Sequence, residues 1–298
     1  MFNIPELKKF SKITKINLGW SLDEKFYLEN SDGDKFLLRI SDLSILDRKK
    51  EESNFLKEIS KLGFLMNEPV SFGISLDDNK VYMILKWVEG LPAKEKLSKL
   101  SESEQYRLGY ISGEILKLMH SLPVNKKFES WEKRYNLKTD KKICDFKETG
   151  YEIPCQKKIL DYIEKNRYLL NNRKQTFNHG DYHVGNMIIS PENDLGIIDF
   201  NRFDFGDPWD EFNRIIWSAQ LSELFASGQI NGYFDNEVPE KFFRLLAFYM
   251  AVNSLASIPW ALKFGNQEIK IMMNNINYML DTYDNFESYI PNWYIEKI

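Results

Sequence analysis

One stretch constrains this 298-residue chain more than any other: HGDYHVGN at residues 179–186, followed by IIDF at residues 197–200. Glycines at the second and seventh positions of the first motif argue against a helix there. Two short apolar strands, 187–189 and 195–198, flank a polar turn and form a hairpin. The sequence therefore predicts a loop and a hairpin that bring together three polar side chains: Asp181, Asn186 and Asp199.

These residue types and their spacing fit phosphoryl transfer to an alcohol. That reaction needs a carboxylate that accepts the hydroxyl proton, and magnesium, which prefers carboxylate and amide oxygens, to neutralise the triphosphate. Asp181 lies five residues before Asn186, as in the protein-kinase catalytic loop, and Asp199 follows where the second metal carboxylate would come. Each residue alone could belong to an ordinary turn or strand end, but the combination favours one base and two magnesium ligands.

Two histidines in the same loop, His179 and His183, raise the alternative of a zinc site. Histidines four residues apart bind zinc best on a helix, and the glycines disfavour a helix here. We therefore expect both histidines to shape the loop by hydrogen bonding to the backbone or to Asp199.

The order of predicted elements indicates an α+β fold. Expected strands lie at 13–18, 25–29, 35–40, 70–74 and 80–87, and one helix lies among them at 45–62. Later helices are expected at 101–120, 156–170, 210–225, 240–264 and 268–283. The residue types and spacing of Ser101 and Glu104 predict a capping box at the start of the helix at 101–120. We place the boundary between a β-rich lobe, 1–90, and a helical lobe, 91–298, near residue 90.

Composition argues against several classes of protein. The net charge of −4 gives no strong attraction to nucleic acid or to an anionic membrane. No apolar run approaches the roughly 20 residues that span a bilayer, and the first residues lack the features of a signal peptide. Cys144 and Cys155 have no neighbouring histidine, which favours reduced thiols. We therefore expect a cytoplasmic, monomeric enzyme that binds neither nucleic acid nor a membrane.

The motifs HGDYHVGN and IIDF, together with FGDPWDE at 205–211, resemble the aminoglycoside phosphotransferase family, which is related to choline kinases and protein kinases. The resemblance covers most of the chain, including the Val-Glu-Gly linker at 88–90 and the helix that ends in Leu-Met-His at 118–120. It implies a bilobal protein-kinase-like fold, with a small antiparallel β lobe carrying one helix, a larger and mainly helical lobe, and the nucleotide between them.

The resemblance also implies roles for particular residues. Asp181 would be the catalytic base, Asn186 and Asp199 would bind Mg²⁺, and Asp207 and Asp210 would brace the loop or its helix. For the base of ATP or GTP, it implies contacts with the Lys86 carbonyl, the Val88 amide and the Leu85 side chain. Without the resemblance, the segment 81–90 reads equally well as an edge strand that leaves a sheet.

The phosphates need a cation from the first lobe, and Arg39 occupies the position of the usual kinase lysine. Arginine can hold phosphate bidentately but with a different reach, and Glu52 is its expected partner, with Glu51 next. The alternative is a solvent-facing strand residue. Gly19 and Ser21, between the first two strands, could let backbone amides approach a phosphate, although an ordinary hairpin loop is at least as good an interpretation.

The acceptor side is marked by charge. The stretch from residue 181 to residue 240 holds twelve acidic and two basic residues, a net charge of −10. An acidic floor beside the loop would attract a polycation, and aminoglycosides are polyamines with many hydroxyls. We therefore expect an aminoglycoside acceptor; the candidate contacts are Asp204, Glu211, Asp235 and Glu237. A solvated acidic face is the alternative reading of each.

Other functions stay open from sequence. The acceptor could be another small hydroxylated molecule, such as a macrolide, an amino alcohol or a sugar. A nucleotide-binding protein without catalysis is disfavoured, because the base and both metal ligands are intact. A protein kinase is disfavoured, because no Ala-Pro-Glu element follows Asp199.

Overall fold

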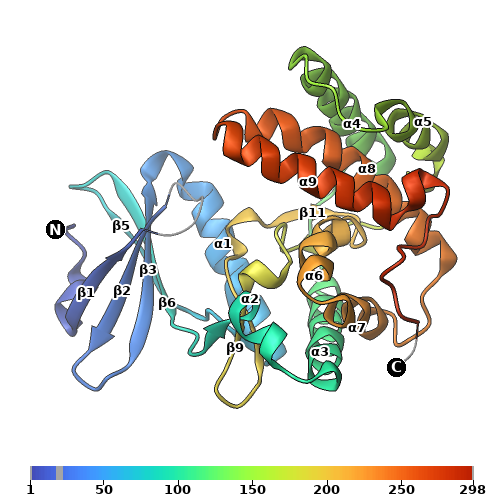
Figure 1. Ribbon diagram of the computed structural model, residues 1–298. Coiled ribbons are helices and arrows are strands. Elements are labelled where there is room, and N and C mark those ends of the chain that lie inside the picture. The colour runs from blue at the N-terminus through green and yellow to red at the C-terminus, as the bar shows by residue number, and fades with distance from the viewer. Residues whose placement is uncertain (1, 18–22, 297–298) are drawn as a thin grey trace. The chain divides into compact units, whose positions relative to one another are not determined.

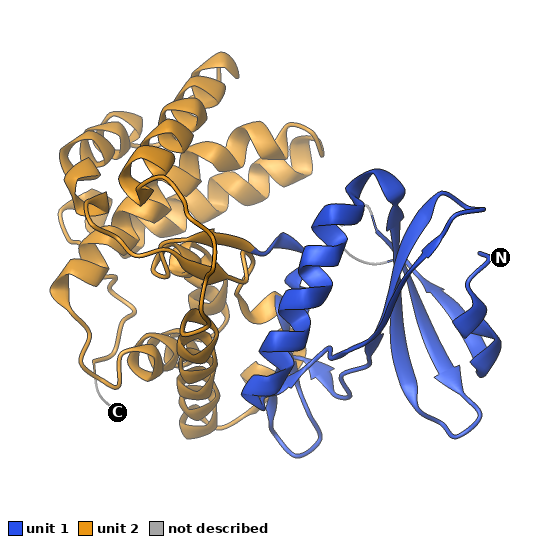
Figure 2. Cartoon of the chain, turned by 180° about the vertical axis from the view of Figure 1, so that it is seen from behind, with its two compact units in different colours: residues 1–93, 186–203 blue, residues 94–185, 204–298 orange. Residues whose placement is uncertain are grey.

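The computed structural model describes residues 2–17 and 23–296, and the chain forms two compact units (Figure 1). Figure 2 shows the first unit, residues 1–93 and 186–203, in blue and the second, residues 94–185 and 204–298, in orange. The first unit thus includes the hairpin segment that the expected division at residue 90 assigned to the second lobe. The reason is strand pairing, which joins this hairpin to short strands of the first unit.

An antiparallel five-stranded sheet in the order β1-β2-β3-β6-β5 forms the body of the first unit. Its strands are β1 (Phe10–Ile16), β2 (Glu24–Asn30), β3 (Lys35–Asp42), β5 (Pro69–Ser75) and β6 (Lys80–Lys86). All five predicted strands are confirmed, although β1 begins three residues earlier than the predicted 13, and the predicted end at Leu18 lies outside the described residues. The turn after β2 closes through the Asn30 side chain, which accepts hydrogen bonds from the backbone of Asp32 and Asp34.

The two faces of this sheet carry different chemistry, because successive side chains of a strand point to opposite faces. One face is an apolar core: Ile4, Leu7, Leu28, Leu38, Ile40, Tyr82 and Ile84. The opposite face carries Lys25, Arg39 and Ser41, and α1 (Leu46–Ile59) packs on β5 and β6. The predicted helix at 45–62 is thus confirmed, since α1 continues as a 3₁₀ turn to residue 62 and stops at Gly63, whose φ is +82°.

A second, four-stranded sheet completes the first unit in the order β4-β10-β9-β7. Its strands are β4 (Leu65–Met66), β7 (Leu91–Pro92), β9 (Met187–Ile189) and β10 (Leu195–Ile197). The predicted hairpin of β9 and β10 is confirmed. Gly196 of β10 lies so close to Val88 that an added Cβ would be 2.9 Å from the valine methyl carbon Cγ1.

The second unit is helical, apart from a two-stranded sheet of β8 (Thr176–Asn178) and β11 (Asp204–Gly206). Its helices are α2 (Ala93–Lys96), α3 (Glu102–His120), α4 (Trp131–Glu148), α5 (Gln156–Asn166), α6 (Ile215–Leu221), α7 (Glu223–Tyr233), α8 (Glu240–Ala261) and α9 (Asn266–Thr282). The first residue of α2, Ala93, still belongs to the first unit. By length and composition α8 could span a bilayer, but 72% of its most apolar window is buried inside the structure. It packs on α4, α5 and α9, so its hydropathy is that of a core helix.

Most helix predictions hold, and two differ from the structure. Ser101 caps α3 by accepting from the backbone of Glu104 at 3.3 Å, which is one half of the expected capping box; the Glu104 side chain accepts from Arg107 at 2.5 and 2.9 Å. The single helix predicted at 210–225 is wrong: a 3₁₀ turn (Asp210–Arg214) and α6 end at Ser222, whose extended backbone starts α7. Helix α4 was not predicted, because lysines interrupt its apolar pattern; the Ser130 side chain caps it.

Helices α3 and α7 cross at unusually close range. An added Cβ on Gly113 of α3 would be 2.2 Å from the Gln229 carbonyl oxygen, and one on Gly232 of α7 would be 2.0 Å from that of Tyr110. Real Cβ atoms do not approach backbone oxygen so closely, so the crossing depends on glycine at these positions.

Candidate functional site

Asp199 and Asn186, the two predicted metal ligands, occupy neighbouring backbone positions in the first unit. The backbone carbonyl of Asn186 accepts from the amide of Ile198 at 3.0 Å, directly before Asp199. Asp199 has a φ of +66°, in the left-handed region that non-glycine residues rarely adopt and that recurs at functional sites. The segment that follows is held on α1, where Arg48 donates to the Phe203 carbonyl and stacks 3.5 Å from its ring centre.

The oxygen donors of Asp199 and Asn186 fit a hard cation such as Mg²⁺. Within residues 2–17 and 23–296, no three carboxylate, histidine or cysteine side chains gather closely enough to hold a metal ion on their own. Magnesium is usually bound by one or two carboxylates together with water and substrate phosphates. A carboxylate beside an amide therefore suits a metal that arrives with a nucleotide, and suits a purely protein-bound metal less well.

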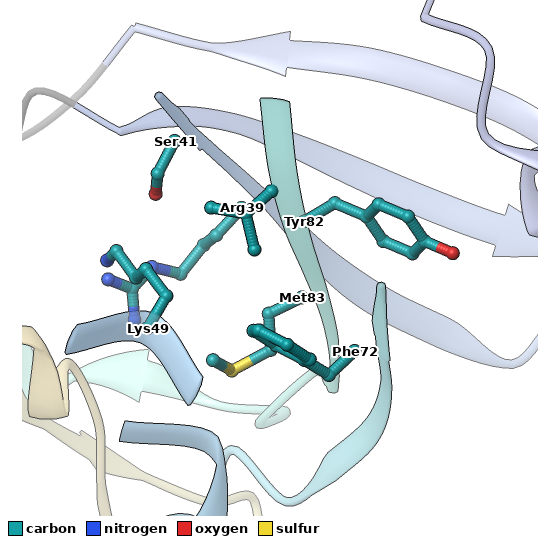
Figure 3. Close-up of a pocket in the computed structure, with 7 residues that line it drawn as sticks. Arg39, Ser41, Lys49, Phe72, Tyr82 and Met83 are labelled. Carbon is teal, nitrogen blue, oxygen red and sulfur yellow. The ribbon is translucent and has the colours of Figure 1, made fainter. Parts of the chain in front are cut away.

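Arg39 belongs to a buried network of two cations and two carboxylates. Its guanidinium donates to Glu52 at 2.6 Å and, through two nitrogens, to Asp23 at 2.5 and 3.0 Å. Lys49 of α1 contacts the same carboxylates, at 2.7 Å for Asp23 and 3.1 Å for Glu52, and Ser41 donates to Asp23 at 2.6 Å. Figure 3 shows the Arg39 and Lys49 nitrogens next to each other. The expected Arg39–Glu52 ion pair is present, but Asp23 and Lys49 close the network around it.

The charges in this network stabilise one another. Burial alone would raise the pKa of Asp23, but Arg39 and Lys49 outweigh it and lower that pKa to about 2. Burial likewise opposes the charge of Arg39, whereas Glu52 and Asp23 raise its pKa above the ordinary arginine value. Removing any one charged member would leave one buried charge uncompensated, which is strongly destabilising. The network therefore acts as a structural clamp between β3 and α1.

A cavity beside the clamp is too small for a nucleotide. Its volume is about 180 Å³ even when the space that opens to solvent is included, whereas ligand pockets usually measure about 300–1,000 Å³. The residues that line it, drawn in Figure 3, are Arg39, Ser41, Lys49, Phe72, Val81, Tyr82 and Met83. This cavity therefore gives no support to the phosphate contact that we expected of Arg39.

The expected base-binding segment lies at the end of β6. Leu85 and Val88 are buried, and the Lys86 side chain is exposed and paired with Glu68 at 2.6 Å. The Lys86 carbonyl, expected to face the base, accepts from the Asn67 side chain at 2.9 Å and keeps one lone pair for another donor. Gly19 and Ser21, the expected phosphate-loop residues, lie outside the described residues.

Asp181 belongs to the second unit, where two side chains approach its carboxylate. Arg214 Nε lies 3.0 Å and His183 Nε2 lies 3.5 Å from Oδ1 of Asp181. As expected, both histidines shape the loop through its backbone: His179 accepts from the Asp181 amide at 3.2 Å, and His183 accepts from the Gly185 amide at 3.0 Å. The loop thus presents a carboxylate that has a guanidinium at ion-pair distance and an imidazole nearby.

Glu211 is buried inside the second unit and holds the backbone of this loop, so it is not part of an acceptor-binding surface. It is 4% exposed, and its two carboxylate oxygens accept from the Gly180 amide at 2.9 and 3.2 Å. Burial raises the pKa of Glu211 to about 7, although the hydrogen bond from Gly180 and the charge of Arg214 oppose the shift. The predicted substrate contact at Glu211 is therefore corrected: the carboxyl is used inside the fold.

This raised pKa predicts a stability that depends on pH. The folded state keeps its proton up to about pH 7, whereas the unfolded state loses it near 4.5, so stability falls as pH rises between these values. The total effect is on the order of 3 kcal/mol. Glu211→Gln, which mimics the protonated form, should remove this decline. We expect the melting temperature of the variant, relative to that of the parent, to be higher at pH 8 than at pH 5. The same difference in melting temperature at both pH values would contradict the assignment.

The other acidic candidates do not form one site. Asp204 is exposed and caps the Phe205 amide, Asp235 is exposed and pairs with Lys117, and Glu237 is exposed. In the described part of the chain, no hydrogen bond or ion pair joins any of these to another or to Glu211. The acidic segment also divides between the two units. Its net charge of −10 therefore does not mark a single acidic floor, which corrects the expectation from sequence.

Asp207 and Asp210 brace the turn that follows the loop, as the resemblance implied. Asp207 is fully buried, accepts from Arg173 at 2.5 and 2.7 Å and from Tyr249 at 2.7 Å, and its carbonyl accepts from the Asp210 amide. Asp210 accepts from Tyr135 of α4 at 3.3 Å.

Two basic residues that contact predicted site residues, one in each unit, were not identified from the sequence. Arg214 is one of two basic residues in the acidic segment 181–240, and a cation among so many carboxylates could have been predicted to pair with one of them. Lys25 lies 3.4 Å from Asp199, a contact between residues 174 positions apart that only the tertiary structure reveals.

Comparison with known proteins agrees with this geometry. The model of the phosphotransferase enzyme family matches residues 12–243, and none of the curated proteins matches the sequence. Among solved structures, the GDP complex of aminoglycoside 2'-phosphotransferase-IIIa has a TM-score of 0.69 at 14% identity, over 91% of this chain and 92% of that one. ADP-bound aminoglycoside phosphotransferase APH(2'')-Ib has a TM-score of 0.63 at 18% identity, over 92% of this chain and 98% of that one.

A third similar structure is the amicoumacin kinase hAmiN in complex with AMP-PNP, Ca²⁺ and Ami, with a TM-score of 0.62 at 14% identity over 98% of this chain and 92% of that one. At such identities the likeness establishes the fold, and it confirms the expected bilobal protein-kinase-like architecture. The family match covers well over half of the chain, including the Asp181 loop and Asp199. The chain therefore belongs to the phosphotransferase enzyme family.

Proposed function

We propose that this protein is a small-molecule kinase that transfers the γ-phosphoryl group of ATP or GTP to a hydroxyl group, with an aminoglycoside as the acceptor. The observation that carries the proposal is the Asp181 carboxylate on its loop, with the Arg214 guanidinium 3.0 Å and the His183 imidazole 3.5 Å from its Oδ1. The family match supports a phosphotransferase, and the structurally similar amicoumacin kinase is in complex with the nucleotide AMP-PNP and Ami.

In the proposed mechanism, Asp181 accepts the proton of the acceptor hydroxyl and orients its oxygen. Arg214 places a positive charge 3.0 Å from the carboxylate, and Glu211 fixes the backbone of the preceding residue, Gly180, by accepting its amide hydrogen. Asp199 and Asn186 would hold Mg²⁺, which supplies positive charge against the triphosphate when bound. The protein thus contributes mainly positioning and electrostatics, as is usual for phosphoryl transfer.

A kinase for a neutral hydroxylated molecule is the second candidate. It is favoured by the burial of Asp207, Asp210 and Glu211, and by the cation Arg214 next to the base. These features reduce the negative charge available to attract a polyamine.

An acceptor screen tests the proposal and separates the two candidates. Purified protein with Mg²⁺ and either nucleotide should consume the nucleotide in the presence of an aminoglycoside and add one phosphoryl group to it, as measured by mass spectrometry. The apparent acceptor affinity should weaken with added salt, because salt screens attraction over about 8–10 Å. Phosphorylation of macrolides or sugars only, without salt dependence, would favour the second candidate. Protein that binds neither nucleotide would contradict both.

A further inference from the structure

We infer that Lys25 is the first-unit cation that contacts the phosphates of the nucleotide, and that Arg39 serves as a structural residue. The inference rests on the proposed function and adds to it a residue that neither the kinase pattern nor the sequence motifs identify. It depends on which basic side chain of the sheet remains available to a ligand.

Arg39 is not available, because carboxylates already use its donors. Three nitrogens of its guanidinium bond to Asp23 and Glu52 at 2.5–3.0 Å, and the residue is 4% exposed. A phosphate at Arg39 would have to displace the Asp23 carboxylate. That displacement would also break the contacts of Asp23 with Lys49 and Ser41.

Lys49 is engaged in the same way. Its ammonium contacts Asp23 and Glu52, and its side chain is 9% exposed. Both cations of the clamp are therefore balanced by the two buried carboxylates, and neither leaves a spare positive charge for a ligand.

Lys25 lies next to the clamp but outside it. The register of β2 and β3 places it directly opposite Arg39, on the face of the sheet that also carries Ser41. Its side chain is 15% exposed, and its ammonium lies 3.4 Å from Oδ2 of Asp199, whose own side chain is 28% exposed. The Lys25 ammonium thus contacts Asp199, the carboxylate of the first unit that we assign to the metal.

The chemistry of Lys25 suits a phosphate. An ammonium group is a compact charge with three donors on a flexible stem, so it can bind phosphate oxygens as a point charge. A kinase needs such a cation close to its metal carboxylate, because triphosphate and metal bind together. Asp199 balances the charge of Lys25 in the nucleotide-free protein, and no buried partner has to be displaced when a phosphate arrives.

Binding of adenosine and of ATP, without acceptor, tests this assignment. With Mg²⁺ present, calorimetry should show that Lys25→Met loses roughly tenfold to a hundredfold in ATP affinity, as expected for a lost charged hydrogen bond. Adenosine affinity should stay the same, and Lys25→Arg should keep part of the ATP affinity. Lys12→Met is the matched control: Lys12 lies on β1 with its side chain 61% exposed, and the ratio of the two affinities should not change. Guanosine and GTP replace this pair if the parent prefers guanine.

Three results would overturn the inference. One is an unchanged ratio of ATP to adenosine affinity in Lys25→Met. Another is a loss of the same size for both ligands, accompanied by a lower melting temperature, which would show a structural role; Lys25→Gln repeats the measurement with a polar side chain. The third is a loss of ATP preference in Arg39→Lys but not in Lys25→Met. A parent protein that binds neither ATP nor GTP would instead overturn the proposed function itself.

Discussion

Replacing Asp181 with asparagine is expected to lower turnover by at least about a hundredfold, which is the usual contribution of a general base. The amide keeps the size of the side chain but cannot accept the hydroxyl proton. It also removes the negative charge that pairs with Arg214 at 3.0 Å. Nucleotide affinity should hardly change, because the predicted metal ligands, Asn186 and Asp199, are untouched. Steady-state kinetics with the acceptor found by screening, together with calorimetric titration of the nucleotide, measures both quantities.

Asp204→Asn provides the matched control for this prediction. It makes the same carboxylate-to-amide change in the same unit, at an exposed residue whose side chain accepts from the Phe205 amide. We expect its turnover to equal that of the parent. Near-normal turnover in Asp181→Asn would rule out the catalytic base, and a similar loss in both variants would point to a general effect of charge.

Gly232→Ala is expected to destabilise the helical unit by about 3 kcal/mol, toward the upper end of the usual cost of overpacking. The new Cβ would lie 2.0 Å from the backbone oxygen of Tyr110, so α3 and α7 must move apart. Intrinsic helix propensity alone predicts the opposite sign, since alanine stabilises a helix interior by about 1 kcal/mol relative to glycine. The sign of the change in unfolding free energy therefore reports directly on the helix crossing.

Denaturant titration followed by helical circular dichroism measures this change. Gly113→Ala, which meets the Gln229 carbonyl from the other helix, should behave similarly. Glu114→Ala lies on the exposed side of α3 and should leave stability within about 0.5 kcal/mol, as surface substitutions usually do. A stabilised Gly232→Ala variant would show that the two backbones are not in close contact.

Local patterns in the sequence determined much of the architecture. Alternating and helical periodicity, with glycine and turn residues between them, located the five strands of the main sheet, α1, α3 and the β9–β10 hairpin. The spacing of Asp181, Asn186 and Asp199 depends only on a loop and a hairpin, which neighbouring residues specify. The Arg39–Glu52 pair was also predictable, because one strand and the next helix carry it. Such features need few long-range contacts.

Tertiary structure alone decided which of the charged residues remain available to a ligand. A count of acidic residues contains no information on burial, so Glu211 was assigned to an acceptor floor although it lies inside the fold beneath Gly180. The approach of Asp23 to Arg39 and the position of Lys25 beside Asp199 depend on strand register and on contacts across many residues of sequence. Sequence thus specified the local geometry of the Asp181 loop, whereas packing determined the partner of each charge, because burial and pairing arise only when distant segments meet.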